Sequence, residues 1–222
     1  MYFCAVPYFQ EINNKNWSTY SAVQITLIYL VGILGICSPW RDYIVILTPF
    51  NLLLTFFVTF YKHERKDFSF ISIILAIMMA TYCIEVIGVK TGEIFGEYFY
   101  GKTLGLKIFT VPPIIGIVWA TLIYSIGVLL SQVKLRRKLI FSLAGASIMT
   151  LLDILIEPIA IRLDFWHWKN EQIPLQNFLA WWMISFVIFL LVPKHIFSSE
   201  NKLAVWCLIL QFLFFIFLNI FI

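Results

Sequence analysis

The chain has 222 residues, of which 61% are hydrophobic and 18% aromatic, whereas only 13% are charged. Soluble domains are typically about 45 to 50% apolar, so this composition excludes an ordinary soluble protein and indicates an integral membrane protein. The net charge of +4 comes chiefly from loop residues, above all those in Lys134–Lys138, and therefore does not indicate nucleic-acid binding.

Apolar runs of membrane-spanning length fill nearly the whole chain. A spanning helix needs about 20 mostly apolar residues. Seven such runs follow one another in chain order: Tyr20–Ser38, Arg41–Tyr61, Phe68–Ile87, Val111–Ser131, Leu139–Ile161, Gln176–Val192 and Leu203–Ile222. We therefore predict an all-α protein, a polytopic bundle of about seven transmembrane spans that forms a single integral membrane domain over residues 1–222. The segment Met1–Trp17 lacks the basic start and continuous apolar stretch of a signal peptide, so we expect the first span to be retained.

Positive charges are unevenly divided between the loops on the two sides of the predicted bundle. If the chain crosses the membrane seven times, ten of its 16 Lys and Arg residues fall on the side of the N-terminus. Because cytoplasmic loops carry an excess of Lys and Arg, this bias predicts a cytoplasmic N-terminus and an external C-terminus.

Several kinds of membrane chemistry lack their usual residues in this chain. The last run contains no lysine for a retinal Schiff base, and His63, His167 and His195 lie at or outside the ends of the runs, away from any haem within the bundle. The four cysteines are isolated, and no phosphate-binding loop, dinucleotide fingerprint or aspartate-rich diphosphate motif occurs. The sequence therefore predicts chemistry without a metal or cofactor, carried by carboxylates.

Glu85 ends an apolar run and opens a glycine-rich segment. Within it Gly88, Gly92 and Gly96 recur every four residues. Close packing of helices or a flexible loop would account for these glycines by themselves. The polar residues that interleave with them favour the lining of a polar site instead, and they are Glu85, Thr91, Glu93, Glu97, Tyr98 and Tyr100.

Two acids lie within the apolar run Leu139–Ile161. Asp153 and Glu157 are four residues apart, which places them on one face of a helix, where an ionisable group at membrane depth costs about 2.5 to 3.5 kcal/mol. Two carboxylates so close in a low dielectric cannot both ionise cheaply, so one should stay protonated near neutral pH. A proton donor beside a carboxylate is the arrangement of general acid/base catalysis. Alternatively, the two acids satisfy Tyr or Trp donors on neighbouring helices.

The loop that follows the two acids is rich in aromatic and amide side chains. It contains Trp166 and Trp168, and the next run begins with Asn177 and Trp181. His167, between the first two tryptophans, is expected to have a structural or interfacial role in an aromatic belt. Counting the spans places this loop and the glycine-rich segment on the same side of the membrane, where we expect them to cover one cavity.

These segments resemble a known family of membrane proteins. From Glu85 the chain reads Glu-Val-Ile-Gly-Val-Lys-Thr-Gly-Glu-Ile-Phe-Gly-Glu-Tyr-Phe-Tyr-Gly, and it continues with Leu104-Gly105, Val111-Pro112, Trp119, Asp153, Glu157-Pro158, Trp166-x-Trp168 and Ile173-Pro174-x-x-Asn177. This pattern is similar to the carotenoid biosynthesis membrane proteins, a family that includes carotenoid 1,2-hydratases. The similarity extends over Glu85–Trp182, and the first two runs and the last contribute only hydrophobicity.

The resemblance implies hydration of the terminal C1–C2 double bond of an acyclic carotenoid end group, as in lycopene or gamma-carotene, by acid/base catalysis without a cofactor. It implies a bacterial inner (cytoplasmic) membrane as the location and contact with carotenoid and lipid, and it leaves an association with other enzymes of the pathway open. The predicted catalytic residues are Glu85, Asp153 and Glu157. The predicted substrate-binding residues are Glu93, Tyr98, Tyr100, Trp119, Trp166, Asn177 and Trp181.

Other functions stay open from the residues alone. An end-group cyclase, such as a lycopene cyclase, would form a similar cation but capture it with an internal double bond instead of water. A membrane carrier would bind a carotenoid or lipid unchanged, and a small transporter would use the acids to relay protons. Internal repeats would support a transporter, and none is evident.

Overall fold

The computed structural model describes residues 5–64, 66–197 and 200–222, with side chains from residue 20 onward. Most of these residues are helical. The elements are α1 (Ala5–Ile36), α2 (Arg41–Val45), α3 (Thr48–Tyr61), α4 (Phe68–Thr91), β1 (Tyr98–Tyr100), α5 (Ile114–Gln132), α6 (Lys138–Arg162), β2 (Trp166–Trp168), α7 (Leu175–Leu191), the 3₁₀ turn η1 (Lys194–Ile196) and α8 (Lys202–Phe221).

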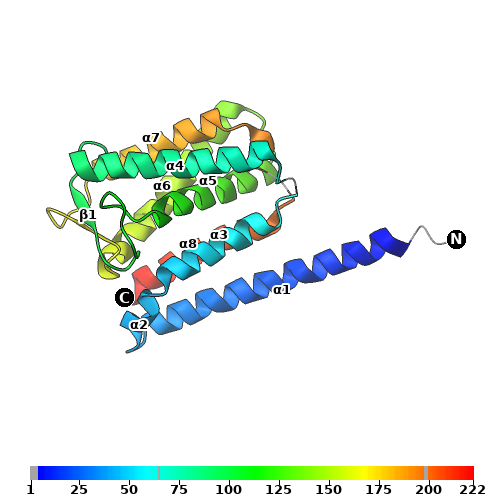
Figure 1. Ribbon diagram of the computed structural model, residues 1–222, viewed down its shortest axis with the longest axis horizontal. Helices are drawn as coiled ribbons and strands as arrows, with labels where there is room; N and C mark the ends of the chain where they lie inside the picture. The colour runs from blue at the N-terminus through cyan, green and yellow to red at the C-terminus, as the bar shows by residue number, and fades with distance from the viewer. Residues whose placement is uncertain (1–4, 65, 198–199) are drawn as a thin grey trace.

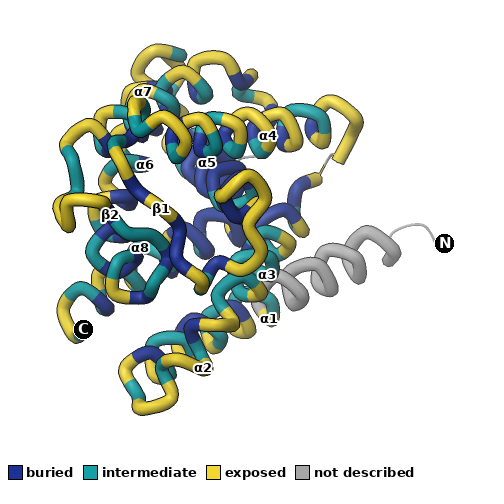
Figure 2. Tube along the Cα trace, turned by 60° about the vertical axis from the view of Figure 1, so that its left-hand side comes forward, coloured by how far each residue is buried: buried dark blue, intermediate teal, exposed yellow. Residues whose placement is uncertain are grey.

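Helix α5 occupies the centre of the bundle. It packs against α3, α4, α6, α7 and α8, while α1 lies at the edge against α8 and α3 (Figure 1). The sequence of α5 carries no charged residue, and its buried side chains extend from Ile114 to Leu130 around the helix. Because a helix that is apolar all round is a buried helix, α5 forms the core (Figure 2). The other helices pack around it.

Four helices among the described residues are long and apolar enough to cross a membrane, namely α4, α5, α6 and α8. They correspond to four of the seven predicted runs. The other three runs form shorter apolar helices, which are residues 20–36 of α1, α3 and α7. The predicted all-helical membrane bundle is confirmed in this coarser form, and a crossing by all seven runs stays a prediction.

The run predicted over Arg41–Tyr61 divides into two helices instead of one. Helix α2 ends at Val45, and α3 begins at Thr48 with Pro49 in its first turn. Proline lacks the backbone N–H and is tolerated at the start of a helix but not inside it. The remaining α3 has 14 residues and therefore rises about 21 Å, which is less than the roughly 30 Å of a bilayer core.

Two short strands cover one end of the bundle, a feature that the sequence did not indicate. Strands β1 and β2 pair antiparallel, with Tyr98 opposite Trp168 and Tyr100 opposite Trp166. The glycine-rich segment and the loop after α6 therefore lie side by side at the same end of the bundle (Figure 1). This arrangement confirms their predicted proximity.

Candidate active site

The strand pair directs aromatic side chains toward the bundle. Alternate residues of a strand point to the same face, so Tyr98 and Tyr100 of β1 are both buried whereas Phe99 between them is exposed. Trp166 and Trp168 of β2 likewise lie on one face. Each of these four rings carries a hydrogen-bond donor, and each donor reaches a carboxyl group.

Glu85 of α4 accepts three hydrogen bonds. Its Oε2 accepts from the hydroxyls of Tyr98 (2.5 Å) and Tyr100 (2.9 Å). Its Oε1 accepts from Nε1 of Trp119 on α5 (3.0 Å). Glu85 is only 3% exposed, so these three donors replace the water that would otherwise solvate its carboxyl group.

The end of α4 explains how β1 returns to Glu85. Gly92 caps the helix in the left-handed conformation (φ 71°), which glycine adopts without strain. The chain then reverses, and the ring of Phe95 packs so closely on Gly88 that a Cβ there would lie 2.6 Å from it. The two tyrosines of β1 are thereby brought back over the last turns of α4.

Glu157 of α6 also accepts three hydrogen bonds. Its Oε2 accepts from Nε1 of Trp166 (3.0 Å) and Trp168 (2.9 Å), and its Oε1 accepts from Nδ2 of Asn177 on α7 (2.9 Å). The same Nδ2 donates to Oδ2 of Asp153 (2.9 Å), so the two acids share one face of α6, as predicted. Asp153 is fully buried, and its Oδ1 has no hydrogen-bond partner among the described residues.

The tyrosine hydroxyls of β1 lie outside the spanning helices and remain donors. Burial, and then the neighbouring Glu85 carboxyl group, raise the pKa of Tyr98 and of Tyr100 well above the usual range. Both hydroxyls therefore stay protonated at neutral and moderately alkaline pH, and their hydrogen bonds to Glu85 persist.

Aromatic rings surround the two glutamates. Trp119 stacks on Trp181 with ring centroids 4.1 Å apart, and Tyr98 packs on Trp168 at 5.2 Å. The faces of such rings carry negative charge density and attract cations. The site therefore combines carboxyl groups with surfaces that stabilise positive charge.

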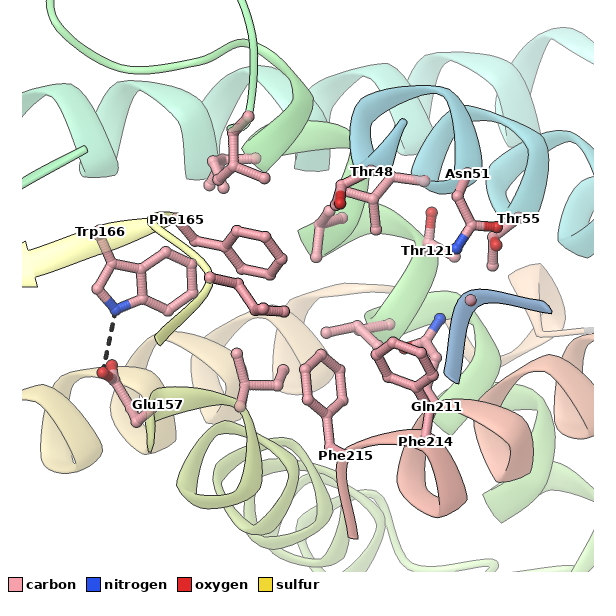
Figure 3. A pocket seen from close by; sticks show the side chains of 18 of the residues that line it. Thr48, Asn51, Thr55, Thr121, Glu157, Phe165, Trp166, Gln211, Phe214 and Phe215 are labelled. Atoms are coloured by element: carbon pink, nitrogen blue, oxygen red, sulfur yellow. Dashed lines mark hydrogen bonds between the residues drawn. The ribbon is translucent and has the colours of Figure 1, made fainter. Parts of the chain in front are cut away.

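A cavity of about 330 Å³ adjoins this cluster. Glu85, Glu157 and Asn177 line it, whereas Asp153 does not. Figure 3 shows Glu157 and Trp166 at one end of the view and phenylalanine rings along the middle. The cavity is thus largely apolar, with its charged groups at one end.

The cavity extends to the outer surface of the bundle. Val31 of α1, Phe50 of α3 and Leu47, just before α3, line it and are each more than half exposed. Large exposed apolar side chains on a membrane-spanning bundle face lipid. An apolar ligand therefore has a route into the cavity from the side, between α1 and α3.

Nine of the ten predicted site residues form one connected cluster. They are Glu85, Tyr98, Tyr100, Trp119, Asp153, Glu157, Trp166, Asn177 and Trp181. Glu93 is not brought to it, because this residue follows the left-handed cap of α4, is exposed and does not line the cavity.

Trp168 belongs to the cluster although it was not among the predicted site residues. It donates to Glu157 and lines the cavity. Its spacing of two from Trp166 was the available signal, since residues two apart share a face only in a strand. The loop was not expected to contain a strand.

The alternative role expected for the acids, acceptance from Tyr and Trp donors, is also met in this geometry. This alternative role does not explain the cavity, because hydrogen-bond donors that only satisfy buried acids need no open space beside them. Within the described part of the chain, no group of three or more His, Cys, Asp or Glu side chains is placed to hold a metal ion.

The chain is similar in sequence to known proteins. The family described as carotenoid biosynthesis protein matches residues 46–222 of this chain. Bisanhydrobacterioruberin hydratase of Haloarcula japonica is 28% identical over 131 residues, which are 53% of this chain and 43% of that protein. The chain thus spans less than half the length of this curated relative. No solved structure matches the chain.

Proposed function

The chain belongs to the carotenoid biosynthesis protein family, and from this premise we propose that it adds water to the terminal C1–C2 double bond of an acyclic carotenoid end group. The observation that carries the proposal is the pair of glutamates, Glu85 and Glu157, each held by three donors beside one largely apolar cavity. Similarity to a protein named as a hydratase supports the same reaction.

The chemistry needs an acid, a base and a surface that tolerates a cation. Transfer of a proton to C2 consumes the double bond and leaves a tertiary cation at C1. A water oxygen then bonds to C1 and releases a proton to a carboxylate. The proton returns to the acid before the next turnover, so the net change is the addition of water without oxidation or reduction.

We assign proton donation to Glu157. This residue lines the cavity and is linked through Asn177 to Asp153, and two carboxyl groups so close in a low dielectric share a proton. Indole N–H groups only donate. The N–H donors of Trp166, Trp168 and Asn177 stabilise the carboxylate that remains once Glu157 has passed its proton to the substrate, and the adjacent Asp153 keeps the pair protonated before that step.

We assign activation of water to Glu85. Hydrogen bonds from Tyr98, Tyr100 and Trp119 stabilise the carboxylate form, which is the form that accepts a proton. The stacked rings of Trp119 and Trp181 also stabilise the cation, with about 2 kcal/mol available from a desolvated aromatic face.

The substrate is expected to enter from the membrane. Cavities that hold ligands range from about 300 to 1,000 Å³, and this one is about 330 Å³. It would hold the end group and a part of the polyene, while the rest of the long chain stays in lipid beyond the opening between α1 and α3.

The test is product analysis with the purified protein in lipid vesicles, supplied with lycopene or gamma-carotene. In water enriched in heavy oxygen, the tertiary alcohol should carry the isotope, and in deuterated water deuterium should appear on the adjacent carbon. The activity should persist without dioxygen and in the presence of a chelator. A hydroxyl labelled from dioxygen would instead identify an oxygenase and overturn the proposal.

The same assay separates the alternative functions. A cyclised product of unchanged mass would identify an end-group cyclase. A carotenoid that is bound but chemically unchanged would identify a carrier.

A further inference from the structure

The far end of the cavity carries polar side chains that the proposed hydration does not use. We propose that this end is a binding subsite for a neutral hydroxyl group. We call it the distal subsite, and it consists of Thr48, Asn51, Thr55, Thr121 and Gln211, which Figure 3 labels, and of Tyr29, whose hydroxyl lies beside that of Thr55.

Four helices contribute to the distal subsite. Thr48, Asn51 and Thr55 are spaced three and four residues apart on α3, so they lie on one face of that helix. Thr121 comes from α5 and Gln211 from α8, across the cavity. The polar groups therefore converge from several helices on one space.

The distal subsite is uncharged. Glu85 and Glu157, at the other end, are the only charged residues among those that line the cavity in the described part of the chain. A carboxylate, phosphate or ammonium group at the distal subsite would be buried without a counter-charge, which is costly. The ligand group that fits is a neutral one.

Asn51 carries an acceptor that nothing in the described structure satisfies. Its Oδ1 is buried without a hydrogen-bond partner. By contrast, Oδ1 of Asn201, at the start of α8, accepts the backbone N–H of Ala204. An unmet buried acceptor is unfavourable, so a ligand that donates to it gains affinity.

The hydrogen-bonding pattern selects a hydroxyl over a carbonyl or an ether. Thr121 Oγ1 already donates to the carbonyl of Ile117 (2.7 Å), so toward the cavity it can only accept. The unmet atom of Asn51 is also an acceptor. A carbonyl or ether oxygen has no hydrogen to offer either group, whereas a hydroxyl donates to one and accepts from other members.

The contact between Tyr29 and Thr55 in the distal subsite is long for a hydrogen bond between helices. The hydroxyls of Tyr29 and Thr55 are 3.5 Å apart. Elsewhere in the bundle, Trp206 donates to Thr26 at 2.9 Å, a normal hydrogen bond between helices. The Tyr29 and Thr55 hydroxyls therefore keep hydrogen-bonding capacity for a ligand.

Two sources supply such a hydroxyl, an oxygenated polyene or a water molecule stored for the reaction. The inference rests on the proposed function in taking a carotenoid as the ligand. Binding, which needs no turnover, tests the polyene as the source, so that a binding preference would support the inference even if hydration failed, and kcat tests water as the source.

The experiment compares an acyclic hydrocarbon polyene with its hydroxylated derivative of equal chain length. Binding to the purified protein in vesicles is followed by quenching of tryptophan fluorescence, because Trp119 and Trp181 line the cavity. The variants are Asn51→Leu and the isosteric Thr55→Val. The matched control is Thr26→Val, whose residue does not line the cavity.

If the hydroxyl belongs to the polyene, the unaltered protein should bind the hydroxylated ligand about two- to tenfold more tightly. Asn51→Leu and Thr55→Val should abolish this preference, and Thr26→Val should retain it. This result would support the distal subsite even if no hydration were detected.

If the hydroxyl is that of water, both ligands should bind equally to every protein. Hydration of the hydrocarbon polyene should then fall in Asn51→Leu and Thr55→Val through kcat, with KM unchanged. Two results would overturn the inference, each together with equal binding of both ligands. One is hydration as fast in the variants as in the unaltered protein, and the other is no hydration in any of them.

Discussion

Each strand supplies the hydrogen-bond donors to one of the two glutamates. Both tyrosines of β1 donate to Glu85, and both tryptophans of β2 donate to Glu157. Because the register of the strand pair is fixed by backbone hydrogen bonds, the donors are in place before a substrate arrives. Such pre-organisation is a large part of what enzymes contribute to stabilising charge in a reaction.

Removal of any one carboxyl group should impair hydration. We expect Glu85→Gln, Asp153→Asn and Glu157→Gln each to lower turnover at least tenfold, because general acid/base groups contribute about a hundredfold or more. Turnover per protein in the membrane is the measurement. Glu93→Gln is the matched control, since Glu93 is exposed and does not line the cavity. Near-normal turnover in all three site variants would contradict the carboxyl mechanism.

Loss of a single donor should have a smaller effect than loss of an acid. Trp168→Phe keeps an aromatic ring but removes the N–H that donates to Glu157. This N–H stabilises the carboxylate that Glu157 becomes after it has given up its proton, and a hydrogen bond to a charged group contributes about 1.5 to 3 kcal/mol, so we expect turnover to fall about tenfold and by less than in Glu157→Gln. Trp182→Phe serves as the control, because Trp182 donates to Ser147 away from the cavity. Equal turnover in the two variants would argue against the donor role.

At the scale of elements, the pairing of β1 with β2 positions the hydrogen-bond donors of the site. This pairing depends on one glycine. Gly101 follows β1, and its backbone N–H donates to the carbonyl of Phe165 (2.9 Å). A Cβ at Gly101 would lie 2.1 Å from the backbone oxygen of Asp164. The loop after α6 can therefore approach β1 only because residue 101 has no side chain.

Gly101→Ala should consequently separate the strands without unfolding the helices. We expect hydration to fall at least tenfold, since a displacement of about 1 Å at a catalytic group can cost a hundredfold. Lys102→Ala is the control, because the Lys102 side chain is exposed while its backbone N–H still donates to Asp164. Turnover of Gly101→Ala equal to that of Lys102→Ala would show that the strand pair does not position the site.

At the scale of the whole molecule, the bundle has its core around α5 and an apolar outer surface. Exposed large side chains such as Phe57, Phe68 and Leu191 lie on outer helices, which suits contact with lipid. The cavity opens onto this apolar surface, so the proposed function places substrate entry, binding and chemistry on one path through the protein.

The predicted topology can be checked by labelling single cysteines in a variant that lacks the natural ones. Lys102→Cys and Lys169→Cys should react with an impermeant reagent from the external side, and Lys134→Cys only from the cytoplasmic side. The first two residues lie in the loops joined by the strand pair, and all three are exposed. Labelling of Lys102→Cys and Lys169→Cys from opposite sides would rule out a shared site in the membrane.

The sequence by itself determined the class of protein and part of the site. Apolar runs of spanning length predict helices because backbone groups in lipid must be satisfied within the segment. The spacing of Asp153 and Glu157 predicts a shared helix face, since that relation is local. The resemblance over Glu85–Trp182 identified the family before any contact was known.

Only the tertiary structure decided which residues meet. The bonds from Tyr98 and Tyr100 to Glu85, the pairing of β1 with β2 and the place of Trp168 depend on contacts between segments far apart in the chain. Glu93 is an acid like three of the predicted site residues, but it points outward because the left-handed turn at Gly92 sets its direction. Apolar periodicity shows which helix face is buried, but the cavity arises where several helices fail to fill the space between them, and that depends on their packing.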